Sequence, residues 1–171
     1  MQLDDWSAVA AVEPVKTCEV SAVALASRFL DRILGNKAGT GAVRHVMAEQ
    51  ALQQAAQIDN RRKAKGVLPA LAGLPVLVKE NCDVKGVACS AGLSFRSNHV
   101  PDQDSSITAR LRELGAVILG VTISDPGAFS VRTAEVTHPI DPALTVGGSS
   151  GGSAAALAAG SALTASPPMM S

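Results

Sequence analysis

The sequence predicts an α/β fold in a single domain, with two buried strands joined by a helix. Residues 74–78 and 116–121 are short, continuous apolar runs, the pattern of strands that are buried on both faces of a sheet. Between them, residues 104–115 carry apolar side chains at helical spacing. This order of elements favours parallel pairing of the two strands. The length of 171 residues fits one domain.

Two helices are predicted before the first strand. Residues 17–35 form an amphipathic pattern, with Thr17 as the N-cap and Gly35 as the C-terminal stop. Residues 43–65 are rich in Ala and Gln and predict a second helix, whose last turn carries basic side chains that complement the helix dipole. Because the dipole accounts for this basic cluster, it does not indicate nucleic-acid binding.

The remaining elements follow from the first strand onward. That strand ends at Lys79, and a lysine at the end of a buried strand is a candidate for chemistry. Asp104 is predicted to cap the next helix, which Gly115 stops before the second strand begins. Residues 147–153 read Gly-Gly-Ser-Ser-Gly-Gly-Ser and predict a tight loop that opens a helix of small residues over 154–160.

Composition and charge exclude several classes of function. Fifteen basic and fifteen acidic residues give a formal net charge of zero, which argues against binding nucleic acid or a membrane surface by bulk charge. An aromatic fraction of 2% argues against stacking platforms for bases. The three cysteines, Cys18, Cys82 and Cys89, form no Cys-x-x-Cys pair, so we expect reduced, buried thiols and neither a disulfide framework nor a zinc or other metal site.

Nothing in the sequence predicts a membrane segment. Residues 1–12 contain Asp4 and Asp5 and lack the basic and apolar regions of a secretory signal, so a cytoplasmic location is expected. From residue 142 onward the chain has no charged residue, but Gly and Ser interrupt every apolar run. No span is long enough to cross a bilayer.

The Gly-Ser loop taken alone is open to several interpretations. Backbone N–H groups at a helix N-terminus favour an anion, so the loop could serve a non-catalytic binding module. Gly147, Ser149 and Gly151 also match the nucleophile elbow of α/β-hydrolases, although that site needs an acid and a histidine later in the chain and none follows Asp141. The glycines also suit a purely structural tight turn.

Four segments together point to one family. They are residues 73–81 (Gly-Leu-Pro-Val-Leu-Val-Lys-Glu-Asn), 100–106 (Val-Pro-Asp-Gln-Asp-Ser-Ser), 114–120 (Leu-Gly-Ala-Val-Ile-Leu-Gly) and the loop 147–153. In order and spacing this set resembles the amidase signature family, from about residue 17 to Gly160. The resemblance implies the N-terminal part of a mixed, open sheet flanked by helices. It also implies hydrolysis of amide C–N bonds, with a small-molecule amide as the partner and no cofactor.

Carried over residue by residue, the resemblance makes Lys79 the catalytic lysine and Ser149 the bridging serine, whose peptide bond with its neighbour is cis in the family. A serine hydroxyl becomes a good nucleophile only when a base takes its proton, and a lysine can do so only when it is neutral. Burial and an absence of nearby carboxylates are expected to lower the pKa of Lys79. Ser149 would then relay the proton from the nucleophile to Lys79.

The substrate side of the site is less defined. The resemblance places Phe129 and Ser130 on the acyl side of the substrate pocket, and Gly147 and Gly148 beside the substrate. Residues 122–129 lack the Asn and Glu that the family usually has after this strand, so the sequence does not choose among amides. His99 and His138 are expected to be surface or structural residues. The oligomeric state is not predicted.

The resemblance places the nucleophilic serine about two dozen residues after Ser149, in a Gly-Ser-Ile-Arg-like run whose backbone N–H groups also form the oxyanion hole. That position falls just past residue 171, so residues 1–171 are predicted to be a single truncated domain that is inactive alone. Residues 161–171 depart from the family pattern, and a one-base shift across Met169 and Met170 encodes an aspartate, which suggests a frameshifted tail. A sequencing error and a deliberately chosen end of the chain are the alternatives. Truncation is also expected to leave the apolar strand residues without packing partners, among them Val76, Leu77, Ile118 and Leu119.

Overall fold

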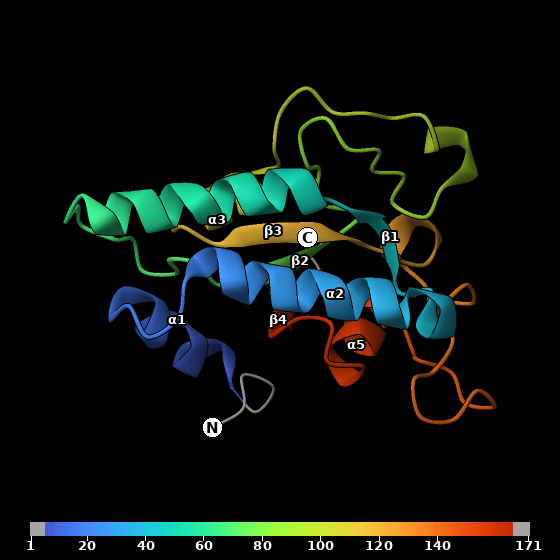
Figure 1. Cartoon of the computed structure of the whole chain (residues 1–171). Coiled ribbons are helices and arrows are strands. Elements are labelled where there is room, and N and C mark those ends of the chain that lie inside the picture. The colour runs from blue at the N-terminus through green and yellow to red at the C-terminus, as the bar shows by residue number, and fades with distance from the viewer. Residues whose placement is uncertain (1–5, 166–171) are drawn as a thin grey trace.

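The computed structural model describes residues 6–165 of the chain. These residues form five α-helices and four strands, which alternate from α2 onward, with short 3-10 turns at Ser94–Arg96 and Pro126–Ala128 (Figure 1). In chain order the helices and strands are α1 (Ala8–Lys16), α2 (Ala22–Thr40), β1 (Val43–Val46), α3 (Ala48–Lys63), β2 (Pro75–Lys79), α4 (Ser106–Glu113), β3 (Val117–Thr122), α5 (Gly151–Ala158) and β4 (Thr164–Ala165).

The strands form one mixed sheet in the order β1-β3-β2-β4. The central strands β2 and β3 are parallel, and their register places Lys79 beside Thr122. The strand β1 is antiparallel to β3, whereas β4 is parallel to β2 at the other edge. The predicted α/β class, with the two apolar runs as parallel strands, is therefore confirmed.

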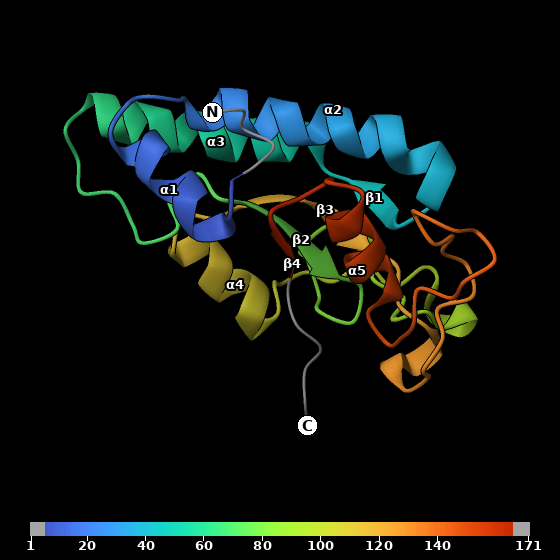
Figure 2. The same ribbon diagram turned by 90° about the horizontal axis from the view of Figure 1, so that it is seen from below.

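Helices cover both faces of this sheet (Figure 2). The helices α2 and α3 lie side by side over one face, and α4 lies on the opposite face. Every residue of β2 and β3 is buried between these layers. Val76, Leu77, Ile118 and Leu119 are at most 1% exposed, so the expectation that they lack packing partners within this chain is wrong.

The N-terminal helices differ from the prediction. Residues 8–16 form α1, and Thr17 is its C-cap instead of the N-cap of the next helix. The helix α2 begins at Ala22, where the Asp59 carboxylate of α3 accepts the N–H groups of Ala22 (2.9 Å) and Val23 (3.1 Å). A buried carboxylate thus satisfies two N–H groups of the first turn from across the helix pair, and Ser21 Oγ accepts a third, that of Ala24 (3.0 Å). At its other end α2 continues past Gly35 to Thr40.

The predicted helix over 43–65 is two elements. Residues 43–46 form β1, which exists only through pairing with β3, and α3 follows it. The basic last turn of α3 is confirmed, and its Arg62 pairs with Asp59 (3.1 Å). The helix α4 is capped by Ser105, whose Oγ accepts from the Thr108 N–H, instead of by Asp104.

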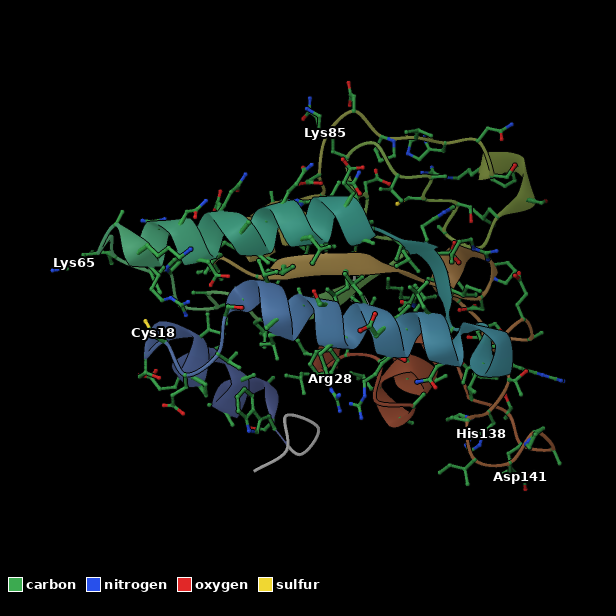
Figure 3. All side chains as sticks on the ribbon, viewed as in Figure 1. Cys18, Arg28, Lys65, Lys85, His138 and Asp141 are labelled. Carbon is green, nitrogen blue, oxygen red and sulfur yellow. The ribbon has the colours of Figure 1, made fainter. Side chains whose placement is uncertain are left out.

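Of the three cysteines, Cys82 and Cys89 are buried and free, as expected, but Cys18 is exposed beyond the end of α1 (Figure 3). No helix in the described part of the chain combines the length and the apolar character needed to span a bilayer. Of the tail predicted to be aberrant, residues 164–165 form β4 beside β2. Residues 166–171, including Met169 and Met170, lie outside the described residues, so the frameshift stays a prediction.

Candidate active site

Lys79 is the last residue of β2 and is completely buried. Its neighbour across the parallel pair is Thr122, the last residue of β3, so the side chain sits where two strands end together. Burial disfavours the ammonium form and lowers the pKa of Lys79 below that of an ordinary lysine, although Asp125, Cys82 and Glu80 oppose the shift. Burial thus shifts the Lys79 equilibrium toward the neutral amine.

Ser149 meets Lys79 from the Gly-Ser loop. Lys79 Nζ donates a hydrogen bond to Ser149 Oγ at 2.7 Å. The peptide bond between Gly148 and Ser149 is cis, as the resemblance implies. Seventy residues separate the two side chains in the sequence, and the structure brings them together as predicted.

Backbone packing holds this loop in place. The Gly147 carbonyl accepts the Thr133 N–H at 2.9 Å. A Cβ at Gly148 would lie 2.6 Å from the Ser130 carbonyl oxygen, and one at Gly152 would lie 2.4 Å from that of Ile123. No side chain fits at either position, so glycine allows the loop to pack directly against the backbone that follows β3.

The N-terminus of α5 is tied to the same segment. Thr133 Oγ1 accepts the Gly151 N–H at 3.2 Å, and the hydroxyls of Thr122 and Ser153 are 2.8 Å apart in the interior. Ser150 occupies the N-cap position without a capping hydrogen bond, and its buried Oγ has no hydrogen-bond partner among the described residues.

The charges of two buried carboxylates, Asp125 and Glu80, act on Lys79, contrary to the expectation of none nearby. The Glu80 side chain accepts hydrogen bonds from the Ser124 N–H (2.7 Å), Ser90 Oγ (2.9 Å) and Arg44 Nε (3.2 Å). Arg44 and Ser90 also line a pocket of about 290 Å³. Asp125 is 1% exposed, and its carboxylate accepts the Ser130 N–H.

The positions of these two carboxylates in the sequence, just after the two central strands, predict that they lie near the site, although the family resemblance does not identify them. Glu80 directly follows Lys79, and Asp125 comes three residues after the end of β3. Because the carboxyl ends of parallel strands meet at one edge of a sheet, residues just after β2 and β3 are expected near each other.

The predicted substrate residues lie at different distances from this pair. Gly147 and Gly148 lie in the loop itself, and the Ser130 backbone packs against Gly148. The Phe129 ring is 93% exposed and lies against Gly127. The roles of these four residues in substrate binding stay predictions.

No group of three or more potential metal ligands occurs within residues 6–165. His138 lies in the loop beyond the C-terminal end of α2, next to Asp141 and away from the sheet (Figure 3). Its Nδ1 accepts the Asp141 N–H at 3.1 Å, which stabilises the turn locally.

The family to which this site belongs follows from a comparison with known proteins. The family model described as Amidase matches residues 24–166, which include Lys79, the Gly-Ser loop and every strand. The chain belongs to the amidase family. The fold agrees, because a solved structure described as a member of the amidase signature enzymes superposes on 92% of this chain.

Several relatives of this amidase-family chain have known names. A glutamyl-tRNA(Gln) amidotransferase subunit of Salinispora tropica is 40% identical over 162 residues, which are 92% of this chain and 33% of the relative. The indoleacetamide hydrolase of Bradyrhizobium diazoefficiens is 32% identical over 160 residues, which are 91% of this chain and 30% of that protein. The chain thus spans about a third of the length of the curated relatives it matches.

In solved structures, too, this chain corresponds to about a third of the matched chain. A bacterial aryl acylamidase of the amidase signature enzymes aligns with a TM-score of 0.84 and 25% identity, over 92% of this chain and 34% of its own. A chain from a vestigial protein complex, described as revealing the evolutionary origins of an s-triazine catabolic enzyme, aligns with a TM-score of 0.88 and 33% identity. That match covers 92% of this amidase-family chain and 36% of the other.

Proposed function

We propose that this chain supplies the base and the proton relay of a Ser-Ser-Lys amidase, which hydrolyses the C–N bond of a carboxylic amide. The single observation that carries the proposal is the 2.7 Å hydrogen bond between Lys79 Nζ and Ser149 Oγ. Membership of the amidase family supports it. So does the burial of Lys79, which favours a neutral amine.

In the proposed reaction, the oxygen of a nucleophilic serine attacks the amide carbonyl. Its proton passes to Ser149 Oγ while the Ser149 proton passes to neutral Lys79, so that an ammonium forms at the end of β2. The reverse relay delivers that proton to the leaving nitrogen as the C–N bond breaks. Water then hydrolyses the acyl-serine ester through the same relay, which releases the acid and restores the serine.

The nucleophile is proposed to lie about two residues beyond residue 171. Without a nucleophile, a serine hydrolase loses roughly a million-fold in rate. Residues 1–171 alone should therefore show no amide turnover above the buffer rate. The frameshift interpretation of residues 161–171 belongs to the same proposal.

The substrate is proposed to be a small amide that enters beside Gly147 and Gly148, with Ser130 and Phe129 on its acyl side. The packing of the Ser130 backbone against Gly148 supports the position of Ser130. The named relatives include an indoleacetamide hydrolase and a glutamyl-tRNA(Gln) amidotransferase subunit, so the family membership does not choose one amide. A cytoplasmic location remains a proposal.

The first step in testing the proposed function is to sequence the gene past the codon for Gly160. A continuous or shifted frame that encodes a Gly-Ser-Ile-Arg-like run soon after codon 171 supports the proposal and supplies the longer chain. In that chain, Ser149→Ala and Lys79→Met should each reduce amide hydrolysis by at least about a thousand-fold. The matched control Ser97→Ala, which changes an exposed serine in another loop, should leave the activity unchanged.

Two results would contradict the proposal. If the 171-residue chain reacts with a fluorophosphonate at Ser149 or Ser150, one of these serines is itself a nucleophile and an α/β-hydrolase-like site gains support. If no frame encodes the missing run, and an amide raises the melting temperature without being consumed, a non-catalytic binding module is the better interpretation.

A further inference from the structure

Asp125 is a buried carboxylate with one oxygen engaged and one oxygen open. Its Oδ2 accepts the N–H of Ser130. Its Oδ1 is buried and has no hydrogen-bond partner among the described residues. A buried carboxylate oxygen without a donor is costly, so such an oxygen calls for a specific explanation.

The path of the chain after β3 places Asp125 close to Lys79. The β2–β3 register sets Lys79 beside Thr122, and the Thr122 carbonyl accepts the Glu80 N–H at 3.0 Å. The Ser124 N–H then bonds to the Glu80 carboxylate at 2.7 Å, which folds the segment over the end of β2. Among the charges that act on Lys79, that of Asp125 raises its pKa most.

The same carboxylate also acts on the Ser149 side of the pair. Ser130, which Asp125 holds through its N–H, has its carbonyl oxygen where a Gly148 Cβ would be only 2.6 Å away. The peptide between Gly148 and Ser149 is therefore packed against a segment that Asp125 fixes. One side chain is thus linked to both partners of the 2.7 Å contact.

We propose that Asp125 is a positioning residue for the Lys79–Ser149 pair. Its Oδ2 fixes the Ser130 segment against Gly148, and its Oδ1 is the counter-charge for the ammonium that forms when the relay delivers a proton to Lys79. This inference rests on the proposed function, because only a proton relay makes that ammonium a recurring state of the site.

The other groups that act on Lys79 are less suited to this role. They are the Glu80 carboxylate and the Cys82 thiol. Glu80 already accepts from Arg44, Ser90 and Ser124, so its charge is compensated. The Cys82 thiol carries no charge while it is protonated.

The test measures the protonation of Lys79 directly. The chain contains six lysines, so labelling at lysine ¹³Cε gives a small set of signals, and the one lost in Lys79→Met is that of Lys79. In Asp125→Asn we expect its titration midpoint to move to lower pH, because the ammonium loses its counter-charge. The control Asp141→Asn removes an exposed carboxylate in a distant loop and should leave the midpoint unchanged (Figure 3).

An unchanged Lys79 midpoint in a folded Asp125→Asn variant would overturn the inference. Asparagine keeps an acceptor for the Ser130 N–H, so a purely structural role of Asp125 predicts that null result. If the variant does not fold, we measure instead how the ¹³Cγ signal of Asp125 in the unsubstituted chain changes with pH. A step in that signal at the Lys79 midpoint supports the pairing, and its absence refutes it.

The titration of Lys79 can be measured whether or not the chain hydrolyses an amide, so the two proposals can fail separately. If Ser149→Ala leaves hydrolysis intact in the longer chain, the proposed function fails while the coupling of Asp125 to Lys79 is still measured. If the relay variants lose activity and the Lys79 midpoint ignores Asp125→Asn, only the role of Asp125 fails.

Discussion

Replacing Gly152 by alanine should displace the Gly-Ser loop from Lys79. A Cβ at this position would lie 2.4 Å from the Ile123 carbonyl oxygen and 2.8 Å from that of Ala42. Neither oxygen is free to move, because Ile123 accepts the Gly152 N–H (3.2 Å) and Ala42 accepts the Ile123 N–H (3.0 Å). Alanine therefore requires the start of α5 to move outward.

The size of the effect follows from these distances. Ordinary contact begins at 3.4 Å, so relief needs a shift of about 1 Å, and overpacking of this kind costs about 1–3 kcal/mol. The better helix propensity of alanine returns up to about 1 kcal/mol. We expect a net loss of up to about 2 kcal/mol, which lowers Tm by up to about 8 °C in a chain of this length.

Urea and thermal unfolding measure this loss, with Gly35→Ala as the control. Gly35 lies in α2, and a Cβ added there would have nothing within 4 Å, so alanine at this position should raise the free energy of unfolding by about 0.5–1 kcal/mol. The same 1 Å shift would take Ser149 Oγ out of hydrogen-bond range of Lys79. A Gly152→Ala chain as stable as Gly35→Ala would refute the close packing of the loop.

Two further predictions concern titration. The pKa of Lys79 is lowered in the folded state. At a pH between that lowered pKa and about 10.4, the pKa of an unfolded lysine, unfolding therefore takes up a proton. The free energy of unfolding consequently rises with pH across this window. Lys79→Met should abolish this rise, whose size is about 1.4 kcal/mol for each unit by which folding lowers the pKa of Lys79. If the free energies of unfolding of the two chains depend on pH in the same way, the prediction is wrong. Burial raises the pKa of Cys89 to about 11, so iodoacetamide at pH 8 should alkylate exposed Cys18 and spare Cys89 until the chain unfolds. Equal labelling, measured by mass spectrometry, would contradict that burial.

The central strands are predictable because their signal is local. Strands β2 and β3 are continuous apolar runs, and both are buried over their full length. The edge strand β1 is predicted as the start of a helix, because its four residues become a strand only by pairing with β3 far along the chain. The predicted start of α2 is wrong although a local cap exists at Ser21, whose Oγ accepts the Ala24 N–H (3.0 Å). The Asp59 carboxylate of α3 binds the two N–H groups before it.

The site divides in the same way. The resemblance identifies Lys79 and Ser149, and the structure places them in hydrogen-bond contact. It misses the carboxylates of Glu80 and Asp125, because their burial depends on how the segments after β2 and β3 fold over each other. Their hydrogen-bond partners are spread over several loops, and no short sequence pattern connects them.

The role of Lys79 as the base is tested most directly by titrating Lys79 in the unsubstituted chain and following its ¹³Cε signal. If Lys79 is the buried base of a relay, its midpoint lies below the value of about 10.4 that an ordinary lysine has. A midpoint at that ordinary value would mean that Lys79 stays an ammonium at neutral pH, and it would contradict its role as the base.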